Sequence, residues 1–235
     1  MNRYSKRETT MTRPARFVAV GFPHHITQRG NQQQKTFKKE EDYLNYLKLT
    51  CVYTKKYALS VIAFCLMPNH VHFVAIPRRL ESMSRTFQFS HMTYTQYFNE
   101  SYDLKGHLWK NRFFSCALDE RHLYEAVRYV ENNPVKAGLV KYAENWKWSS
   151  ASAHLHRNAR FLDLDRVFDF VDVPDWKEYL RERMDETVIK NIRVNTMKGR
   201  PAGNRDFIQN LSKKFGISLE PKPMGRPNSR RANKK

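Results

Sequence analysis

Two hydrophobic spacings alternate along residues 17–155 of the chain. Short, nearly continuous apolar runs rich in β-branched and aromatic residues predict strands, whereas apolar residues three and four positions apart predict helices. The predicted strands are residues 22–29, 59–67, 70–76 and 113–118, and the predicted helices are residues 40–57, 80–99 and 120–132. Pro68-Asn69 separates the second and third strands by a tight turn, and Pro134 stops the last helix.

The predicted order of elements is β-α-β-β-α-β-α. Strands joined by a tight turn pair antiparallel, and the flanking helices must cover an apolar face of the sheet. The pattern therefore predicts an α+β domain over residues 17–155, an antiparallel sheet with its helices on one face, ferredoxin-like in outline. Residues 1–16 are polar and basic, which favours an N-terminal arm outside this domain.

The composition changes after this domain. Residues 156–197 begin with an acidic stretch and continue with a helical pattern near residues 176–190. We interpret them as an extension that packs on, or partly shields, the basic body. Residues 198–235 form a basic tail, in which two Gly-Arg-Pro units flank a short amphipathic helix at residues 207–215.

Positive charge is concentrated near the C-terminus. The 235 residues include 42 Lys+Arg and 23 Asp+Glu, a formal net charge of +19, and residues 190–235 alone hold 13 Lys+Arg against 2 Asp+Glu. Such a surplus indicates either a polyanion partner or a solvated tail. Nucleic acid is favoured over anionic lipid, because the chain also offers aromatic side chains for stacking on bases and no basic amphipathic helix suited to a membrane surface.

Several classes of protein are disfavoured by the composition. The longest unbroken apolar run, residues 61–67, has seven residues, whereas a membrane-spanning helix needs about 20. No apolar signal-peptide core follows the polar N-terminus, so we expect a cytoplasmic protein that does not enter a membrane. The three cysteines have neither metal-type nor redox-type spacing, so we expect neither a disulfide framework nor a cysteine-bound zinc ion.

The segment with the most chemical information is His70-Val71-His72. Side chains at i and i+2 of a strand leave the same face, so His70 and His72 are expected to lie side by side as a platform for a metal ion. The alternative is a pair of histidines on an exposed sheet face. The same spacing recurs at His154 and His156, but that segment has a helical pattern, in which the two side chains diverge by ~200° and cannot easily share a metal.

A tyrosine and an asparagine share one flank of the predicted helix at residues 120–132. Tyr129 lies about 110° from the centre of the apolar stripe, so core packing does not require it. Tyr129 and Asn133 are spaced i, i+4 and could present a hydroxyl nucleophile and an amide oxygen together. The alternative is a tyrosine that covers the rim of the core beside an asparagine that ends the helix. The stripe itself consists of Leu123, Ala126, Val127 and Val130.

In combination, these residues resemble a known family. His70-Val71-His72, Tyr129 and the string Asn-Asn-Pro-Val-Lys-Ala-Gly-Leu-Val at residues 132–140 are similar to motifs of the single-tyrosine HUH transposases. The resemblance is strongest to the REP-associated tyrosine transposases, domesticated relatives of the single-strand insertion-sequence transposases. It covers residues 17–155 and extends to four further strings, at residues 25–31, 66–70, 109–113 and 148–150.

The resemblance implies the HUH endonuclease fold and a metal-dependent endonuclease and strand transferase. By position, Tyr129 is the nucleophile, His70 and His72 are metal ligands, and Asn133 is the third ligand. The tyrosine of such enzymes forms a 5′-phosphotyrosine link and releases a 3′-hydroxyl. The implied substrates are hairpins of repetitive extragenic palindromic DNA with a short guide tetranucleotide, which places the protein on the bacterial nucleoid. A monomer is expected, with a dimer as the alternative.

The chemistry agrees with this implied mechanism. A phenol with a pKa of ~10 is a weak nucleophile at neutral pH and is repelled by a phosphodiester, so a divalent cation is needed. Two imidazoles and one amide oxygen leave coordination positions open, which suits Mg²⁺ or Mn²⁺ better than a closed zinc site. The covalent link conserves the energy of the phosphodiester, so no nucleotide cofactor is expected, and no Gly-rich phosphate loop is present in the sequence.

Five residues are candidates for binding DNA. Arg29 and Asn31, just after the first strand, are candidates for reading the guide, and Arg112 is a candidate phosphate contact. Arg200 and Arg226 are the centres of the two Gly-Arg-Pro units, which resemble minor-groove hooks. The alternatives are an ordinary surface arginine at position 112 and plain linker turns in the tail.

Two other functions remain open at this point. His25-Ile26-Thr27 fits one motif of the metal-free two-histidine phosphoesterases, although His72 stands where their second motif needs Ser or Thr. The other alternative is a non-catalytic hairpin DNA-binding protein with a vestigial site. Metal-dependent nicking that depends on Tyr129 distinguishes the transposase from both.

Overall fold

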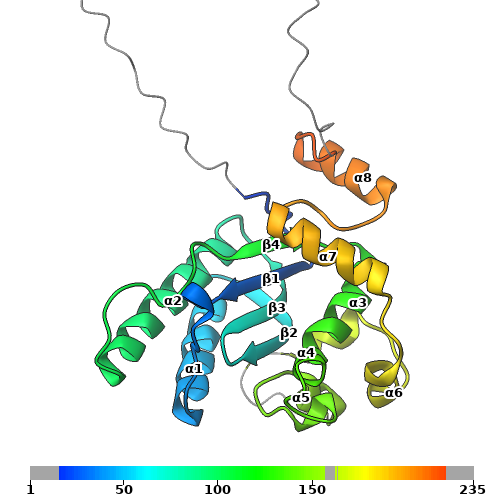
Figure 1. Ribbon diagram of the computed structural model, residues 1–235. Helices are drawn as coiled ribbons and strands as arrows, with labels where there is room; N and C mark the ends of the chain where they lie inside the picture. The colour runs from blue at the N-terminus through cyan, green and yellow to red at the C-terminus, as the bar shows by residue number, and fades with distance from the viewer. Residues whose placement is uncertain (1–15, 157–161, 163, 221–235) are drawn as a thin grey trace, which may run out of the picture.

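The computed structural model of the chain describes residues 16–156, 162 and 164–220. Its four strands and first three α-helices follow the predicted order, β-α-β-β-α-β-α (Figure 1). The strands are β1 (His24–Arg29), β2 (Leu59–Met67), β3 (His70–Pro77) and β4 (Phe114–Ala117). The helices among them are α1 (Glu40–Lys56), α2 (Ser82–Ser101) and α3 (Glu120–Glu131). The other helices are α4 (Asn133–Lys136), α5 (Ala151–Leu155), α6 (Trp176–Arg181), α7 (Glu186–Lys198) and α8 (Arg205–Phe215), with short 3-10 turns at Asn31–Gln33, Ala143–Asn145 and Asp165–Asp169.

The four strands form one antiparallel sheet in the order β2-β3-β1-β4. Pro68-Asn69 is the two-residue turn of the β2–β3 hairpin, in which Met67 pairs with His70. β1 lies between β3 and β4, so the N-terminal strand is central and β4 is an edge of the sheet. The predicted α+β class and the antiparallel sheet are confirmed.

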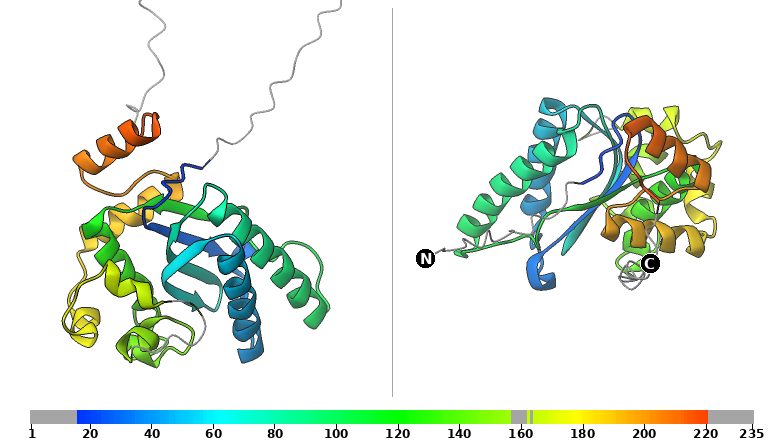
Figure 2. Two further views of the ribbon diagram at one scale, coloured as in Figure 1. Left: turned by 180° about the vertical axis from the view of Figure 1, so that it is seen from behind. Right: turned by 90° about the horizontal axis from the view of Figure 1, so that it is seen from above.

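Helices cover both faces of this sheet, so the prediction of helices on one face is wrong (Figure 2). Phe64 and Phe73 belong to the core under α1 and α2, whereas Cys65 and Val74 belong to the core under α3 and α7. The physical reason is that β2 and β3 are apolar at nearly every position, and both faces of such strands must be shielded from water. Alternating polar residues would have been needed for one open face.

The predicted helix near residues 176–190 is two helices, α6 and α7. Asp185 interrupts it, because the Asp185 side chain accepts hydrogen bonds from the amides of Thr187 and Val188 and so begins α7. α7 continues to Lys198, where Gly199 ends it with a φ of 66°. α7 packs against β4 and α3, so residues 186–198 form part of the main body. None of the helices in the described part of the chain could cross a membrane.

A buried carboxylate joins three helices of this body. Glu131 of α3 is 0 % exposed. Its carboxylate accepts hydrogen bonds from Ser150 Oγ, from His154 Nδ1 at 2.6 Å and from Trp176 Nε1 at 3.0 Å. His154 thus points into the core from α5, while His156 is exposed, which confirms that this second His-x-His pair diverges.

Glu131→Ala is expected to lower the free energy of unfolding by roughly 3 to 5 kcal/mol, because it leaves three buried donors without their acceptor. Urea denaturation measures the change. Glu100→Ala, which removes an exposed carboxylate at the end of α2, is the control and should change the free energy of unfolding by less than about 0.5 kcal/mol. Equal values for the two variants would contradict this prediction.

Candidate active site

The two histidines of β3 lie side by side, as the strand periodicity predicted. Their ring centroids are 4.9 Å apart, with the ring planes at 83° to each other. His70 is half-buried and His72 is 6 % exposed, so they are not a pair on an open sheet face. Val74, two residues further along the same face, packs in the core that β2 and β3 share with α3 and α7.

Each of these imidazoles already uses its Nδ1 atom. His70 Nδ1 lies 2.6 Å from Asn69 Oδ1, and His72 Nδ1 lies 2.9 Å from His25 Nε2. Within the described residues, Nε2 of His70 and Nε2 of His72 make no hydrogen bond. Imidazole ligands of metals commonly donate one N–H to a protein acceptor and bind the metal through the other nitrogen. Nε2 of each imidazole is therefore the ring nitrogen that remains available to a metal ion.

Both imidazoles are neutral at neutral pH, which is the form that binds metals. Burial lowers the pKa of His70 to about 4, and the positive charge of Arg29 adds to this effect. Burial also holds the pKa of His72 well below its usual range. Electrostatic repulsion from four neighbours lowers this pKa further, in the order His70, His25, Arg29 and Arg193.

Tyr129 of α3 lies against these histidines. Its ring centroid is 5.6 Å from that of His72 and 6.0 Å from that of His25, both in edge-to-face contacts. Tyr129 is therefore next to the strand histidines, and its role as the nucleophile stays a prediction. The alternative, a tyrosine that covers the rim of the core, is wrong, because Tyr129 is only 4 % exposed. The reason is α7, from which the Arg193 guanidinium lies 5.5 Å from the centre of the tyrosine ring.

Asn133 belongs to a different helix from Tyr129. α3 ends at Glu131, and Asn133 is the first residue of the short helix α4, as the proline at position 134 favours. Asn133 is half-buried, and its buried side-chain nitrogen has no hydrogen-bond partner among the described residues. Oxygen and nitrogen of an amide exchange places on a flip, so a ligand-accepting oxygen can occupy the same buried position.

The chemistry of the three candidate donors suits a divalent cation with open coordination positions. Among the described residues, no group of three or more His, Cys, Asp or Glu side chains is placed to hold a metal. The donors available are Nε2 of His70, Nε2 of His72 and the amide of Asn133. Two imidazoles and an amide suit Mn²⁺, and Mg²⁺ if water completes the shell.

The structure reveals one residue of the site that the sequence did not single out as such. His25 of β1 is 1 % exposed, and its two ring nitrogens contact His72 and Thr196. His25 has no free nitrogen for acid–base chemistry, so the two-histidine phosphoesterase alternative is not supported. The signals for His25 in the sequence are the family-like string at residues 25–31 and its place in a strand, on the face opposite to that of His24 and Ile26.

The candidate DNA contacts in the described part of the chain come from three segments. Arg29 is exposed and pairs in register with His70, and the half-buried Asn31 begins the 3-10 turn that follows. Gly30 between them is obligatory, because a Cβ atom there would lie 2.4 Å from the carbonyl oxygen of Gln34. Arg200 is half-buried just after α7. Arg226 and its Gly-Arg-Pro unit lie outside the described residues.

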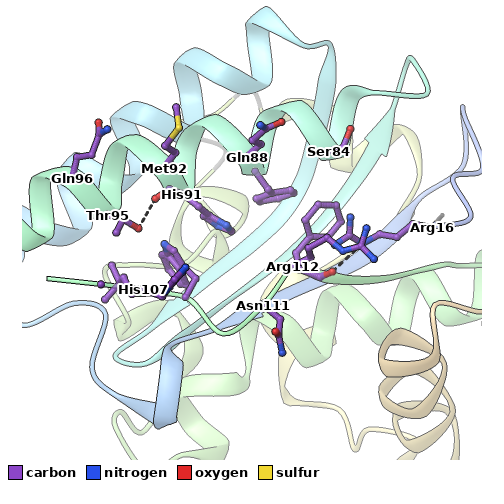
Figure 3. A pocket seen from close by; sticks show the side chains of 15 residues that line it. Arg16, Ser84, Gln88, His91, Met92, Thr95, Gln96, His107, Asn111 and Arg112 are labelled. Atoms are coloured by element: carbon purple, nitrogen blue, oxygen red, sulfur yellow. Dashed lines mark hydrogen bonds between the residues drawn. The ribbon is translucent and has the colours of Figure 1, made fainter. Parts of the chain in front are cut away.

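Arg112 is exposed at a cavity of about 640 Å³ on the other side of the sheet, between α2 and residues 106–113 (Figure 3). Its wall is aromatic, with His91 stacked on Trp109 at a centroid distance of 4.4 Å. Arg16 lies 3.8 Å above the centre of the Phe113 ring. The buried indole Nε1 of Trp109 has no hydrogen-bond partner in the part of the chain that the structure describes. Two cations and stacked rings are the groups that bind phosphates and unpaired bases.

Comparison with known proteins agrees with this geometry. Residues 20–133 match the family model described as IS200-like transposases. A curated protein of Haemophilus influenzae named "Putative REP-associated tyrosine transposase" is 26 % identical over 144 residues, 54 % of this chain and 77 % of that protein. A solved structure of a REP-associated tyrosine transposase bound to a REP hairpin shares the fold, with a TM-score of 0.50 and 20 % identity over 70 % of this chain and 96 % of that chain. Residues 20–133, which include His70, His72, Tyr129 and Asn133, are therefore similar to the IS200-like transposases, as the sequence motifs implied.

Proposed function

We propose that this protein is a metal-dependent endonuclease and strand transferase that acts on single-stranded, hairpin-forming DNA through a 5′-phosphotyrosine intermediate. The observation that carries the proposal is the contact of Tyr129 with His72, beside two imidazoles whose Nε2 atoms are unpaired. The proposed nucleophile and the two proposed metal ligands thus lie together on the face of the sheet that α3 and α7 cover. The hairpin substrate is proposed from the transposase bound to a REP hairpin, which shares this fold.

The proposed reaction is an in-line displacement. Tyr129 Oη attacks phosphorus, the bond between phosphorus and the 3′ oxygen breaks, and the proton lost by the phenol is balanced by the one that the 3′ oxygen takes up. A cation held by His70, His72 and Asn133, Mg²⁺ or Mn²⁺, would supply charge neutralisation of the non-bridging oxygens. Arg193, beside the tyrosine ring, places a further positive charge near the phosphodiester.

Attack of a 3′-hydroxyl on the phosphotyrosine reverses this step and joins strands. The two phosphodiesters have similar energies, so rejoining requires no nucleotide cofactor. One Tyr129 per chain is sufficient for single-strand cleavage, and we propose a monomer as the active form. Equilibrium sedimentation of the DNA-free protein tests this, since a stable dimer would contradict it.

We further propose that unpaired bases of the substrate enter the cavity beside Arg112. Arg112→Ala is expected to weaken binding of a hairpin with a single-stranded 5′ extension by about 3- to 10-fold and to reduce the salt dependence of binding by about one phosphate contact. Lys48→Ala, which removes an exposed cation on α1, is the control. Fluorescence anisotropy at several salt concentrations measures the affinity and its salt dependence. Equal affinities for the two variants would exclude the cavity beside Arg112 as a binding site for the unpaired bases.

The function itself is tested by trapping the intermediate. The protein is incubated with an end-labelled hairpin that carries a 5′ extension, in Mn²⁺ or in EDTA, and resolved on a denaturing protein gel. A metal-dependent labelled protein band is expected. Hairpin binding without any labelled band, over several hairpins, would favour the non-catalytic DNA-binding alternative.

A further inference from the structure

A chain of hydrogen bonds runs from α7 to the candidate metal ligand His72. Thr196 Oγ1 donates to the carbonyl oxygen of Ile192 at 2.7 Å, one turn earlier in α7. His25 Nδ1 lies 2.8 Å from the same Oγ1 atom, and His25 Nε2 lies 2.9 Å from His72 Nδ1. Thr196, His25 and His72 are all buried. Water therefore does not compete for these bonds.

The hydrogen bond from Thr196 to Ile192 determines which atom donates in each of the other hydrogen bonds of this series. A hydroxyl has one proton, and the carbonyl of Ile192 can only accept, so Thr196 Oγ1 must accept from His25. His25 therefore carries its proton on Nδ1. A buried imidazolium without a bonded carboxylate is costly, so His25 is neutral and its Nε2 is an acceptor. His72 must then donate from Nδ1, which leaves the lone pair of its Nε2 free.

The thiol of Cys116, which also contacts Thr196, does not change these donor and acceptor assignments. Cys116 Sγ lies 3.0 Å from Thr196 Oγ1, and either atom could donate by geometry alone. Because the hydroxyl proton is used on Ile192, the hydroxyl does not donate to the thiol, which has Oγ1 and the carbonyl oxygen of Ile192, at 3.8 Å, as its acceptors. Burial raises the pKa of the Cys116 thiol to about 12, so its proton is present at neutral pH.

The tautomer of His70 is fixed in a similar way, by a single residue, Asn69. Asn69 Nδ2 donates to the carbonyl oxygen of Gln33 at 3.4 Å, which turns its Oδ1 toward His70 Nδ1 at 2.6 Å. An amide oxygen accepts only, so His70 also carries its proton on Nδ1. Two unrelated arrangements therefore give the two histidines the same tautomer.

We propose that Thr196 is a positioning residue of the metal site: acting through His25, it fixes the tautomer and the ring orientation in which His72 presents Nε2 to a cation. This inference rests on the proposed function of His72 as a ligand. Thr196 and His25 are 171 residues apart. The metal site of the IS200-like domain is accordingly completed from α7, which lies beyond residues 20–133.

The test compares Thr196→Val with Thr196→Ser in the full-length protein. Long-range ¹H–¹⁵N spectra of the metal-free, DNA-free protein report the tautomer of His72, assigned with a His72→Gln spectrum. The wild type and Thr196→Ser are expected to show the proton of His72 on Nδ1. Thr196→Val is expected to give a mixture of tautomers and a Mn²⁺ affinity lower by roughly 10-fold, the usual range for a partner of a metal ligand.

A second pair of variants keeps the proposal testable if Thr196→Val folds poorly. His25→Gln offers an amide oxygen to His72 Nδ1 without need of Thr196, so Thr196→Val should not lower Mn²⁺ affinity further in that background. An unchanged tautomer in Thr196→Val, a Thr196→Ser that behaves like Thr196→Val, or additive losses in the double variant would each overturn the proposal. Because the spectra need neither DNA nor metal, they succeed or fail independently of DNA cleavage.

Discussion

Tyr129→Phe is expected to abolish the covalent protein–DNA product and to leave hairpin binding within about twofold of the wild type. The substitution removes only Oη, while the ring keeps its edge-to-face contacts with His72 and His25. Loss of an attacking nucleophile costs roughly 10⁴-fold or more in rate, which places any residual product below detection. Denaturing gels of the labelled adduct and anisotropy of the same hairpin measure the two quantities.

Tyr124→Phe is the matched control for this prediction. Tyr124 is a half-buried tyrosine on the same helix, and its hydroxyl contacts the backbone of Asp172. Its removal should lower stability modestly and leave the adduct intact. An adduct of normal yield in Tyr129→Phe would assign the nucleophile to another residue, and loss of hairpin binding in that variant would show that the phenol acts in recognition.

His72→Gln is expected to reduce metal-dependent cleavage by roughly 10³-fold at limiting Mn²⁺, because one of two imidazole ligands is lost. Glutamine approximates the size of the ring, and its amide can still bond His25, so the fold should be maintained. The Mn²⁺ concentration needed for half-maximal cleavage should rise sharply. Titration of Mn²⁺ in the adduct assay measures both effects.

The chain contains its own control for this second prediction. His156 belongs to a His-x-His pair of the same spacing, but it is exposed and its partner His154 is bonded to the buried Glu131. His156→Gln should therefore cleave like the wild type at every Mn²⁺ concentration. A His72→Gln protein with the Mn²⁺ dependence of the wild type would rule out His72 as a ligand.

Most of the fold could be predicted because its elements are encoded by local spacing. The four strands and the first three helices lie within a few residues of their expected positions. The placement of helices on one face was wrong, although the continuous apolar run of β2 contained the signal for burial on both faces. Likewise, the one helix expected near residues 176–190 is two, because a single N-capping aspartate outweighed the helical pattern.

The sequence by itself determined which side chains share a face. Strand periodicity placed His70 beside His72, and helix periodicity separated Tyr129 from the apolar stripe of α3. Only the tertiary structure decided which distant residues contact these side chains. α7 buries Tyr129, and Thr196 forms a hydrogen bond with His25, which is 171 positions away in the sequence. The physical reason is that periodicity depends on backbone geometry within one element, whereas contacts between distant elements depend on how both faces of the sheet are covered.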